Sequence, residues 1–218
     1  HLSYLYKVKQ TKNMKYENLA TNDQLEKLSA KLSSNGFLPI ILNNKSEALE
    51  KIKELIPAGA SVMNGSSVTL KEIGFIDFLK SGSHNWNNIH ANILAEKDEE
   101  KQNQLRKHSV LSDYYLGSAH AITESGEILI ASNTGSQLPH LVYTSQNIIL
   151  VIGSNKITQD IADAFNRINE YVVSLEDERM KSVYGFGTTY AKTLILHKEN
   201  PMFKRQIHII LVKEKLGY

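Results

Sequence analysis

Cysteine is absent from the 218 residues of the sequence. This absence excludes disulfide bonds, thiolate metal ligands, cysteine-ligated iron–sulfur clusters and cysteine nucleophiles. Histidine occurs eight times, but the histidines are scattered, and no two have the spacing of a helical zinc motif. We therefore expect no metal site, and the sequence identifies no cofactor.

Long apolar runs and an excess of one charge are also missing. The 25 Lys and Arg residues nearly balance the 23 Asp and Glu residues, and there is no basic stripe of the kind that neutralises phosphates. The longest apolar run, residues 148–152, is far shorter than the roughly 20 residues of a membrane-spanning helix. The start of the chain has no signal-peptide core. We expect a soluble, cytoplasmic protein that binds neither nucleic acid nor membrane.

The chain is expected to divide into a short leader and one domain. Hydrophobic residues make up 41% of the sequence, which is enough for one sizeable core. The first helical pattern begins at Asn22, so residues 1–21 are expected to form a leader that is flexible or foreign to the native protein, with Met14 as a candidate initiator. Residues 22–218 are expected to form a single α/β domain.

Helix and strand patterns alternate along the first part of the chain. Apolar residues recur at helical spacing over residues 25–32 and 46–56, and short apolar strand patterns follow them at residues 37–42 and 60–63. Buried strand patterns recur later, at residues 147–152 and 207–212. This order predicts a parallel sheet covered by helices.

Three loops that follow predicted strands are candidates for a binding site, because ligands of open α/β sheets bind beyond the carboxyl ends of the strands. Their small residues let backbone N–H groups approach an anion, and their hydroxyl and amide groups add donors. If the loops converge, they form a pocket for a phosphate, a carboxylate or a nucleotide; the alternative is ordinary loop and capping chemistry. The candidate ligand-binding residues are Asn64, Gly65, Ser66, Ser67, Asn133, Thr134, Gly135, Ser136, Asn155 and Lys156.

No loop carries a strict phosphate-binding motif. The Walker spacing of Gly-Lys-Ser/Thr is absent, and "YGFGTTY" at residues 184–190 matches only the first part of a dinucleotide motif. Lys156 either binds an anion as a point charge or is solvated near the start of a helix. The motifs therefore do not indicate which anion the loops would bind.

Glu124 is the candidate catalytic residue. It ends an apolar strand pattern and precedes Ser125 and Gly126, so it is expected to face a neighbouring loop as a general base or a carboxylate nucleophile. His120 and His140 flank this stretch, and a hairpin would bring one of them near Glu124. The alternative is a four-residue turn with Gly126 in a left-handed conformation.

Three stretches resemble one family, in the same order and at similar spacing. They are "AHAITESGEILIA" at 119–131, "ILVIGSNKITQDIADAFNRI" at 149–168 and "KRQIHIILVKEKLGY" at 204–218. They resemble the LUD-domain family of lactate utilisation, which contains the C subunit of the bacterial lactate-utilisation operon. The resemblance runs from about Asn22 to the end of the chain. Two features depart from it: Glu127 stands where the family usually has Thr, and residues 184–201 lack the cysteine that many relatives carry there.

The resemblance implies a Rossmann-like three-layer α/β/α fold with a mostly parallel sheet. That fold is shared with sugar-phosphate isomerases, coenzyme A transferases and 5-formyltetrahydrofolate cyclo-ligase. Coenzyme A transferases carry a catalytic Glu in a Glu-Asn-Gly context, which Glu124-Ser125-Gly126 resembles. The family is tied to the oxidation of L-lactate to pyruvate with iron–sulfur partner subunits. Because this chain has no cysteine, direct electron transfer would need a cofactor that the sequence does not reveal.

Three hypotheses of function remain open, and with them the question of whether the chain is an enzyme. The first is a component of L-lactate oxidation that binds a small anionic or nucleotide-like ligand at the three loops. The second is an enzyme similar to coenzyme A or acyl transferases, with Glu124 as the nucleophile. The third is a non-catalytic assembly subunit that docks iron–sulfur oxidoreductase subunits. Assembly into a homo-oligomer is compatible with each of them.

Overall fold

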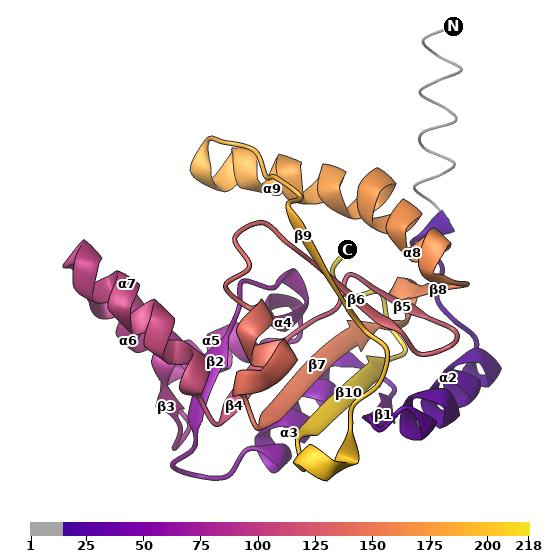
Figure 1. Cartoon of the computed structure of the whole chain (residues 1–218), viewed down its shortest axis with the longest axis horizontal. Helices are drawn as coiled ribbons and strands as arrows, with labels where there is room; N and C mark the ends of the chain where they lie inside the picture. Colours follow the sequence, from indigo (N-terminus) through magenta and orange to yellow (C-terminus); the bar gives the residue numbers. More distant parts are fainter. Residues whose placement is uncertain (1–14) are drawn as a thin grey trace, which may run out of the picture.

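The computed structural model describes residues 15–218, which contain a six-stranded sheet in the order β1-β10-β7-β4-β2-β3 (Figure 1). Every neighbouring pair in this sheet is parallel. The parallel sheet predicted from the alternation of helices and strands is therefore confirmed. Its strands are β1 (Leu38–Leu42), β2 (Ser61–Asn64), β3 (Asn87–Asn88), β4 (Tyr114–Gly117), β7 (Asn147–Gly153) and β10 (Gln206–Val212).

Both faces of the parallel sheet are covered, which explains why its central strands are apolar throughout. Ile149 and Val151 of β7 belong to the core under helices α3 (Lys45–Leu55), α4 (Val68–Glu72) and α5 (Phe75–Ser81). Ile148 and Leu150 point the opposite way, toward helix α2 (Asn22–Ser34). Successive side chains of a strand alternate between faces, so a strand between two layers needs apolar residues at every position. Helices thus flank the sheet in a Rossmann-like three-layer arrangement.

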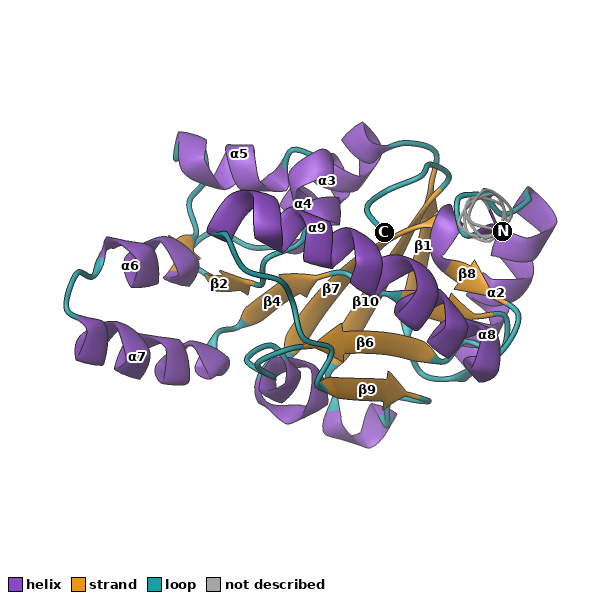
Figure 2. Cartoon of the chain, turned by 90° about the horizontal axis from the view of Figure 1, so that it is seen from above, coloured by secondary structure: helices purple, strands orange, loops and turns teal. Residues whose placement is uncertain are grey.

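A second, smaller sheet lies against the α2 side of the first (Figure 2). Its order is β8-β5-β6-β9, and its central pair is an antiparallel hairpin. Ile122 and Ile128 face the main core, whereas Ala121 and Leu129 face helix α8 (Ile161–Arg167). The strands of this sheet are β5 (Ala121–Thr123), β6 (Ile128–Ser132), β8 (Ile157–Thr158) and β9 (Lys192–Leu196).

The remaining helices lie outside these layers or continue α8. A π-helical segment, Ile168–Val172, joins α8 to helix α9 (Val173–Tyr184). Helices α6 (Ile89–Ala95) and α7 (Glu99–His108) project from the β3 end of the sheet, and α7 buries none of its residues (Figure 1). Within residues 15–218, no helix is long and apolar enough to cross a membrane. Short helical segments lie at Ser109–Leu111, His140–Thr144, Ser154–Lys156 and Pro201–Phe203.

The packed part of the chain begins earlier than residue 22, where we expected it. Tyr16 is buried, and its ring lies 6.0 Å from the ring of Tyr171, measured between centroids. Lys15 forms an ion pair with Asp163 at 2.5 Å. The leader predicted over residues 1–21 therefore includes a docked segment, while Met14 and the residues before it lie outside the described part of the chain.

Candidate functional site

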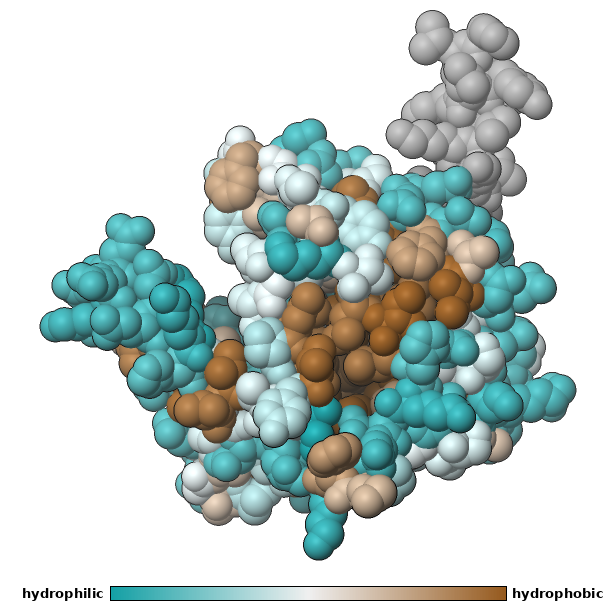
Figure 3. All heavy atoms as spheres, in the orientation of Figure 1, coloured by the Kyte–Doolittle hydropathy of each residue, from teal (hydrophilic) through white to brown (hydrophobic). Residues whose placement is uncertain are grey.

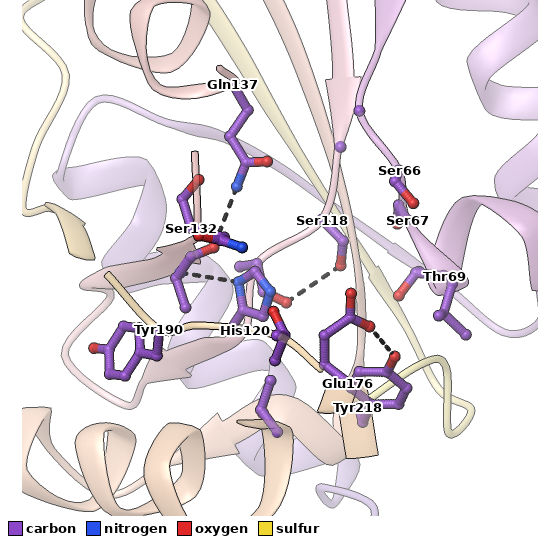
Figure 4. A pocket seen from close by; sticks show the side chains of 18 of the residues that line it. Ser66, Ser67, Thr69, Ser118, His120, Ser132, Gln137, Glu176, Tyr190 and Tyr218 are labelled. Atoms are coloured by element: carbon purple, nitrogen blue, oxygen red, sulfur yellow. Dashed lines mark hydrogen bonds between the residues drawn. The ribbon is translucent and has the colours of Figure 1, made fainter. Parts of the chain in front are cut away.

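A cavity of about 290 Å³ lies beyond the carboxyl ends of β2 and β4, where the two sheets meet α9 (Figure 4). Its wall is built from the segments that follow β2, β4 and β6, together with side chains from α9, residues 188–190 and Tyr218. This is the edge at which open parallel sheets bind ligands, because no strand or crossover helix fills the space there.

The cavity brings together residues from all three loops singled out in the sequence. The loop after β2 contributes its glycine and serines, the loop after β6 contributes polar side chains, and the loop after β7 contributes one lysine. Ligand binding by these residues stays a prediction, and the cavity is the place where they come together. The predicted residues that line the cavity are Gly65, Ser66, Ser67, Asn133, Thr134, Ser136 and Lys156.

Three predicted binding residues do not line the cavity and have other roles in the structure. The side-chain amide of Asn64 donates to its neighbour's carbonyl, Gly65 O, at 3.1 Å. The side chain of Asn155 accepts from the Leu216 N–H at 3.1 Å, which fixes the chain after β10. Gly135 has φ +86°, a left-handed conformation that suits glycine in a turn. These are the capping and loop roles that we considered as the alternative.

Lys156 lies at the floor of the cavity and is only 2% exposed. Its Nζ donates to Thr69 Oγ1 at 2.9 Å, to Ser118 Oγ at 3.1 Å and to Ala119 O at 3.1 Å. All three acceptors are neutral, and no Asp or Glu among residues 15–218 forms an ion pair with it. Burial, and secondarily the positive charge of Arg167, lowers the pKa of Lys156 to about 7. The lysine is thus poised between its two protonation states near neutral pH.

His120 presents a neutral imidazole to the same cavity. The backbone N–H of Ala131 donates to His120 Nδ1 at 3.0 Å, so the ring proton resides on Nε2. Burial, followed by the charges of Lys156 and Arg167, lowers the pKa of His120 to about 3. Arg167 also donates to the His120 carbonyl, which holds this stretch of backbone in place. His120 is therefore a hydrogen-bond donor without charge.

The cavity wall formed by α9 carries one negative and one positive side chain that neutralise each other. Arg179 and Glu176 form an ion pair at 2.7 Å, and the Tyr218 hydroxyl also donates to Glu176 (Figure 4). Burial pushes the pKa of Glu176 up, but the hydrogen bonds from Arg179 and Tyr218 outweigh it and leave the pKa below its usual value. Because this pair is neutral overall, Lys156 gives the cavity its net positive character.

The expected position of Glu124 is wrong. Its side chain is exposed, outside the cavity wall, and its carboxylate accepts a hydrogen bond from Gln24 Nε2 at 3.4 Å. The chain leaves the cavity at His120, follows β5 away from it and turns at Glu124 before β6 returns. The rule that ligands bind beyond the carboxyl ends of strands holds for parallel strands. It does not apply to an antiparallel hairpin, whose turn here lies at the end away from the cavity. Gly126 has φ +90°, as in the turn we gave as the alternative.

His140 is also outside the cavity, although it supports one of its walls. It is buried, its ring is stacked on that of Tyr115 at 4.4 Å between centroids, and its Nδ1 lies 2.8 Å from Ser145 Oγ. Burial lowers the pKa of His140 to about 4. Tyr115 lines the cavity, so His140 supports the site through this stacked ring.

Several lining residues were not identified as binding residues from the sequence, although His120 was named there as a neighbour of Glu124. Ser118 and His120 follow β4, and the strand-end rule would have found them had the end of β4 been placed at Gly117. Glu176 and Arg179 lie on α9, which has no buried residue and so no apolar periodicity to reveal it. Within residues 15–218, no group of three or more His, Asp or Glu side chains could hold a metal ion.

Comparisons with known proteins agree with this fold. A crystal structure of a DUF162 family protein from Deinococcus radiodurans is similar with a TM-score of 0.54 and 12% sequence identity, over 89% of this chain and 99% of that one. No curated protein gives a significant match. A family model described as the LUD domain matches residues 25–212, and the chain therefore belongs to the LUD-domain family.

Proposed function

We propose that this chain binds a small anion of lactate utilisation, a 2-hydroxy acid such as lactate or the corresponding 2-oxo acid, in the cavity. Membership of the LUD-domain family supports the metabolic context. The observation that carries the proposal is the buried Lys156, whose ammonium touches only neutral oxygens on the cavity floor. A buried cation that has no carboxylate in direct contact favours an anionic ligand in a polar cavity.

The size and donors of the cavity fit a small acid. Its volume of about 290 Å³ lies at the lower end for ligand sites, which favours a small molecule over an intact coenzyme. The hydroxyl groups of Ser66, Ser67 and Thr134 and the Nε2–H of His120 line the same space. These neutral donors suit a hydroxyl, carbonyl or carboxylate oxygen, while Lys156 supplies the charge.

Binding of an anion is expected to be coupled to proton uptake. A carboxylate about 4 Å from Nζ contributes roughly 4 kcal/mol at an effective dielectric constant of 20, which favours the ammonium form. Because the pKa of Lys156 is about 7 in the free chain, part of the population must gain a proton when the anion binds at pH 7 to 8. Calorimetry in buffers of different ionisation enthalpy measures that proton directly.

The test combines ligand screening with a matched pair of variants. Lactate, pyruvate, inorganic phosphate and coenzyme A are compared by thermal shift and titration calorimetry. We expect one of the small acids to stabilise the chain, K156M to weaken its binding at least about tenfold, and K45M, at an exposed lysine, to leave binding unchanged. Absence of binding by every acid, or equal binding by K156M, contradicts the proposal.

We further propose that the chain docks an iron–sulfur subunit of lactate oxidation through β9. This strand is the edge of the second sheet, and its Leu194 and Leu196 stay partly exposed while they pack against the main core. Figure 3 shows a hydrophobic area in the middle of this face, where β6 and β9 cross it.

Gel filtration with purified iron–sulfur subunits tests this docking proposal. The L196K variant should abolish co-elution, and the L94K variant, on α6, should not. Self-association would appear in the same experiment, and co-elution of L196K would reject β9 as the surface.

A further inference from the structure

Ser118 and Lys156 meet at the floor of the cavity in an arrangement that ligand binding alone does not require. We propose that Ser118 is a nucleophile, and Lys156 its general base, for the hydrolysis of short carboxylic esters and thioesters. The inference uses the same cavity as the proposed function but does not depend on lactate as the ligand. It rests on the hydrogen bonds of Lys156 Nζ, on the different exposure of the Ser118 and Thr69 hydroxyls, and on the neighbouring His120.

Ser118 is placed at the cavity by the end of β4. It follows Gly117, the last residue of that strand, and its side chain is partly exposed and lines the cavity (Figure 4). Its Oγ donates to Val151 O at 2.7 Å and accepts from Lys156 Nζ at 3.1 Å. The amine therefore lies within proton-transfer distance of a hydroxyl that a ligand in the cavity can reach.

The surroundings of Nζ determine what happens when the lysine loses a proton. As an ammonium it uses its three N–H groups on Thr69 Oγ1, Ser118 Oγ and Ala119 O. As an amine it has a lone pair that must accept a hydrogen bond. The carbonyl of Ala119 cannot donate, so the donor is the hydroxyl of Thr69 or of Ser118; both residues line the cavity, but Thr69 is only 1% exposed, so Ser118 is the hydroxyl that a substrate reaches. When the Ser118 hydroxyl turns from Val151 O to the amine, it donates a hydrogen bond to Nζ, and the lysine takes this proton as Oγ attacks a substrate.

The amine form is available near neutral pH because burial, and secondarily the charge of Arg167, outweigh the opposing charge of Glu72 and hold the pKa of Lys156 at about 7. Activation of a hydroxyl by a desolvated lysine requires such a shift. His120 adds the third element, since its Nε2–H is a neutral donor on the same cavity wall. A donor of this kind stabilises the oxyanion of a tetrahedral intermediate without transferring its proton.

The reaction balances with water as the second reactant. Ser118 Oγ attacks the carbonyl carbon, its proton passes to Lys156 Nζ, and the carbonyl electron pair moves to the oxygen. The bond to the leaving alkoxide or thiolate then breaks, and the lysine ammonium returns the proton to that group. Water attacks the acyl-serine with Lys156 again as the base, which releases the acid and regenerates the hydroxyl. The cavity volume suits a short acyl group.

The experiment uses a fluorophosphonate probe and p-nitrophenyl acetate with the full chain. Peptide mass spectrometry should locate the probe on Ser118, and ester hydrolysis should rise with pH and level off above an apparent pKa near 7. S118A should abolish labelling and hydrolysis, and K156M should reduce the rate about 10²- to 10⁴-fold. The exposed-serine variant S46A should match the unaltered chain.

The outcomes separate this inference from the proposed function. S118A should still bind the small acid that binds the unaltered chain, because Lys156 remains, whereas K156M should lose both properties. Labelling at another residue, or hydrolysis that S118A retains, overturns the assignment of Ser118. A folded chain, checked by circular dichroism, that binds an acid but neither reacts with the probe nor cleaves the ester overturns only the hydrolytic inference.

Discussion

Lys156 shows how one buried residue links the stability of this chain to its chemistry. An amine that is 2% exposed and hydrogen-bonded only to neutral oxygens loses most of its hydration without gaining a carboxylate in direct contact. The folded chain therefore favours the uncharged form, and an anion that enters the cavity reverses that preference. The same shift that makes the lysine a binding residue for anions also makes it a base.

The first prediction concerns the pH dependence of stability. The pKa of Lys156 falls on folding from its ordinary value of 10.5 to about 7, so between these values the unfolded chain holds more protons than the folded one. The free energy of unfolding should therefore rise with pH from about 7 to 10, by up to about 1.4 kcal/mol per pH unit from this group. Urea unfolding at pH 7, 8 and 9 measures it.

K156M is the control for this rise, because methionine preserves the volume and removes the titration. The rise between pH 7 and 9 should be flatter in K156M than in the unaltered chain. Above pH 10, tyrosines with raised pKa values, such as Tyr16 with a pKa of about 12, act in the opposite direction, so the comparison stays below that range. Equal slopes in the two proteins would show that Lys156 does not titrate as we infer.

The β5–β6 hairpin is the element that decides which residues reach the cavity. Its antiparallel path sends Glu124 to one end and returns Ser132 and Asn133 to the other, where they line the cavity. The turn packs on α2, with Asn35 Nδ2 donating to Ser125 O at 3.1 Å. This end of the hairpin is thus a structural contact, and the cavity end carries the chemistry.

The second prediction tests that contact. Gly126 has φ +90°, and a Cβ there would lie 2.9 Å from Asn35 Nδ2, so G126A meets both backbone strain and a steric contact. Gly59 has φ +82° with nothing within 4 Å, so G59A meets only the strain. G59A should cost about 1–2 kcal/mol and G126A more, as measured by denaturant unfolding. An equal loss would mean that Asn35 moves aside freely.

At the level of the whole molecule, the cavity exists because two sheets and the α8–α9 helical arm meet. Arg167 is buried at that junction, between the His120 carbonyl and the rings of Tyr16 and Tyr171, at 6.0 and 5.3 Å from their centroids. Two aromatic faces partly compensate the burial of its charge. The segment before α2 therefore helps to hold the arm that forms the far wall of the cavity.

The third prediction tests this role of the N-terminal segment. Y16A removes a buried ring that packs on Tyr171 and Arg167, and it should lower the free energy of unfolding by about 3 kcal/mol. K15M removes the neighbouring ion pair, in which the lysine side chain is 60% exposed, and should cost less than about 1 kcal/mol. Calorimetric melting measures both. A small effect of Y16A would place the start of the packed domain at α2 after all.

The parts of the fold that could be predicted are those with a strong local signal. The apolar runs of β7 and β10 and the amphipathic patterns of α2 and α3 appear within a residue or two of their predicted places. Residues 171–174 and 184–201 show no clear helix or strand pattern, yet the first segment runs into α9 and the second contains β9. Those elements are held by long-range contacts, which leave little local pattern.

The sequence by itself determined the parallel sheet, the family and the three polar loops, because burial on both faces of a strand and small polar residues after it are local properties of the chain. Only the tertiary structure decided which polar residues share a cavity. It turned Glu124 outward through the hairpin, and it buried Lys156 beside Ser118 and His120. The shift in the pKa of a lysine comes from the neighbours that surround it and the water they exclude, and these belong to segments far apart in the sequence.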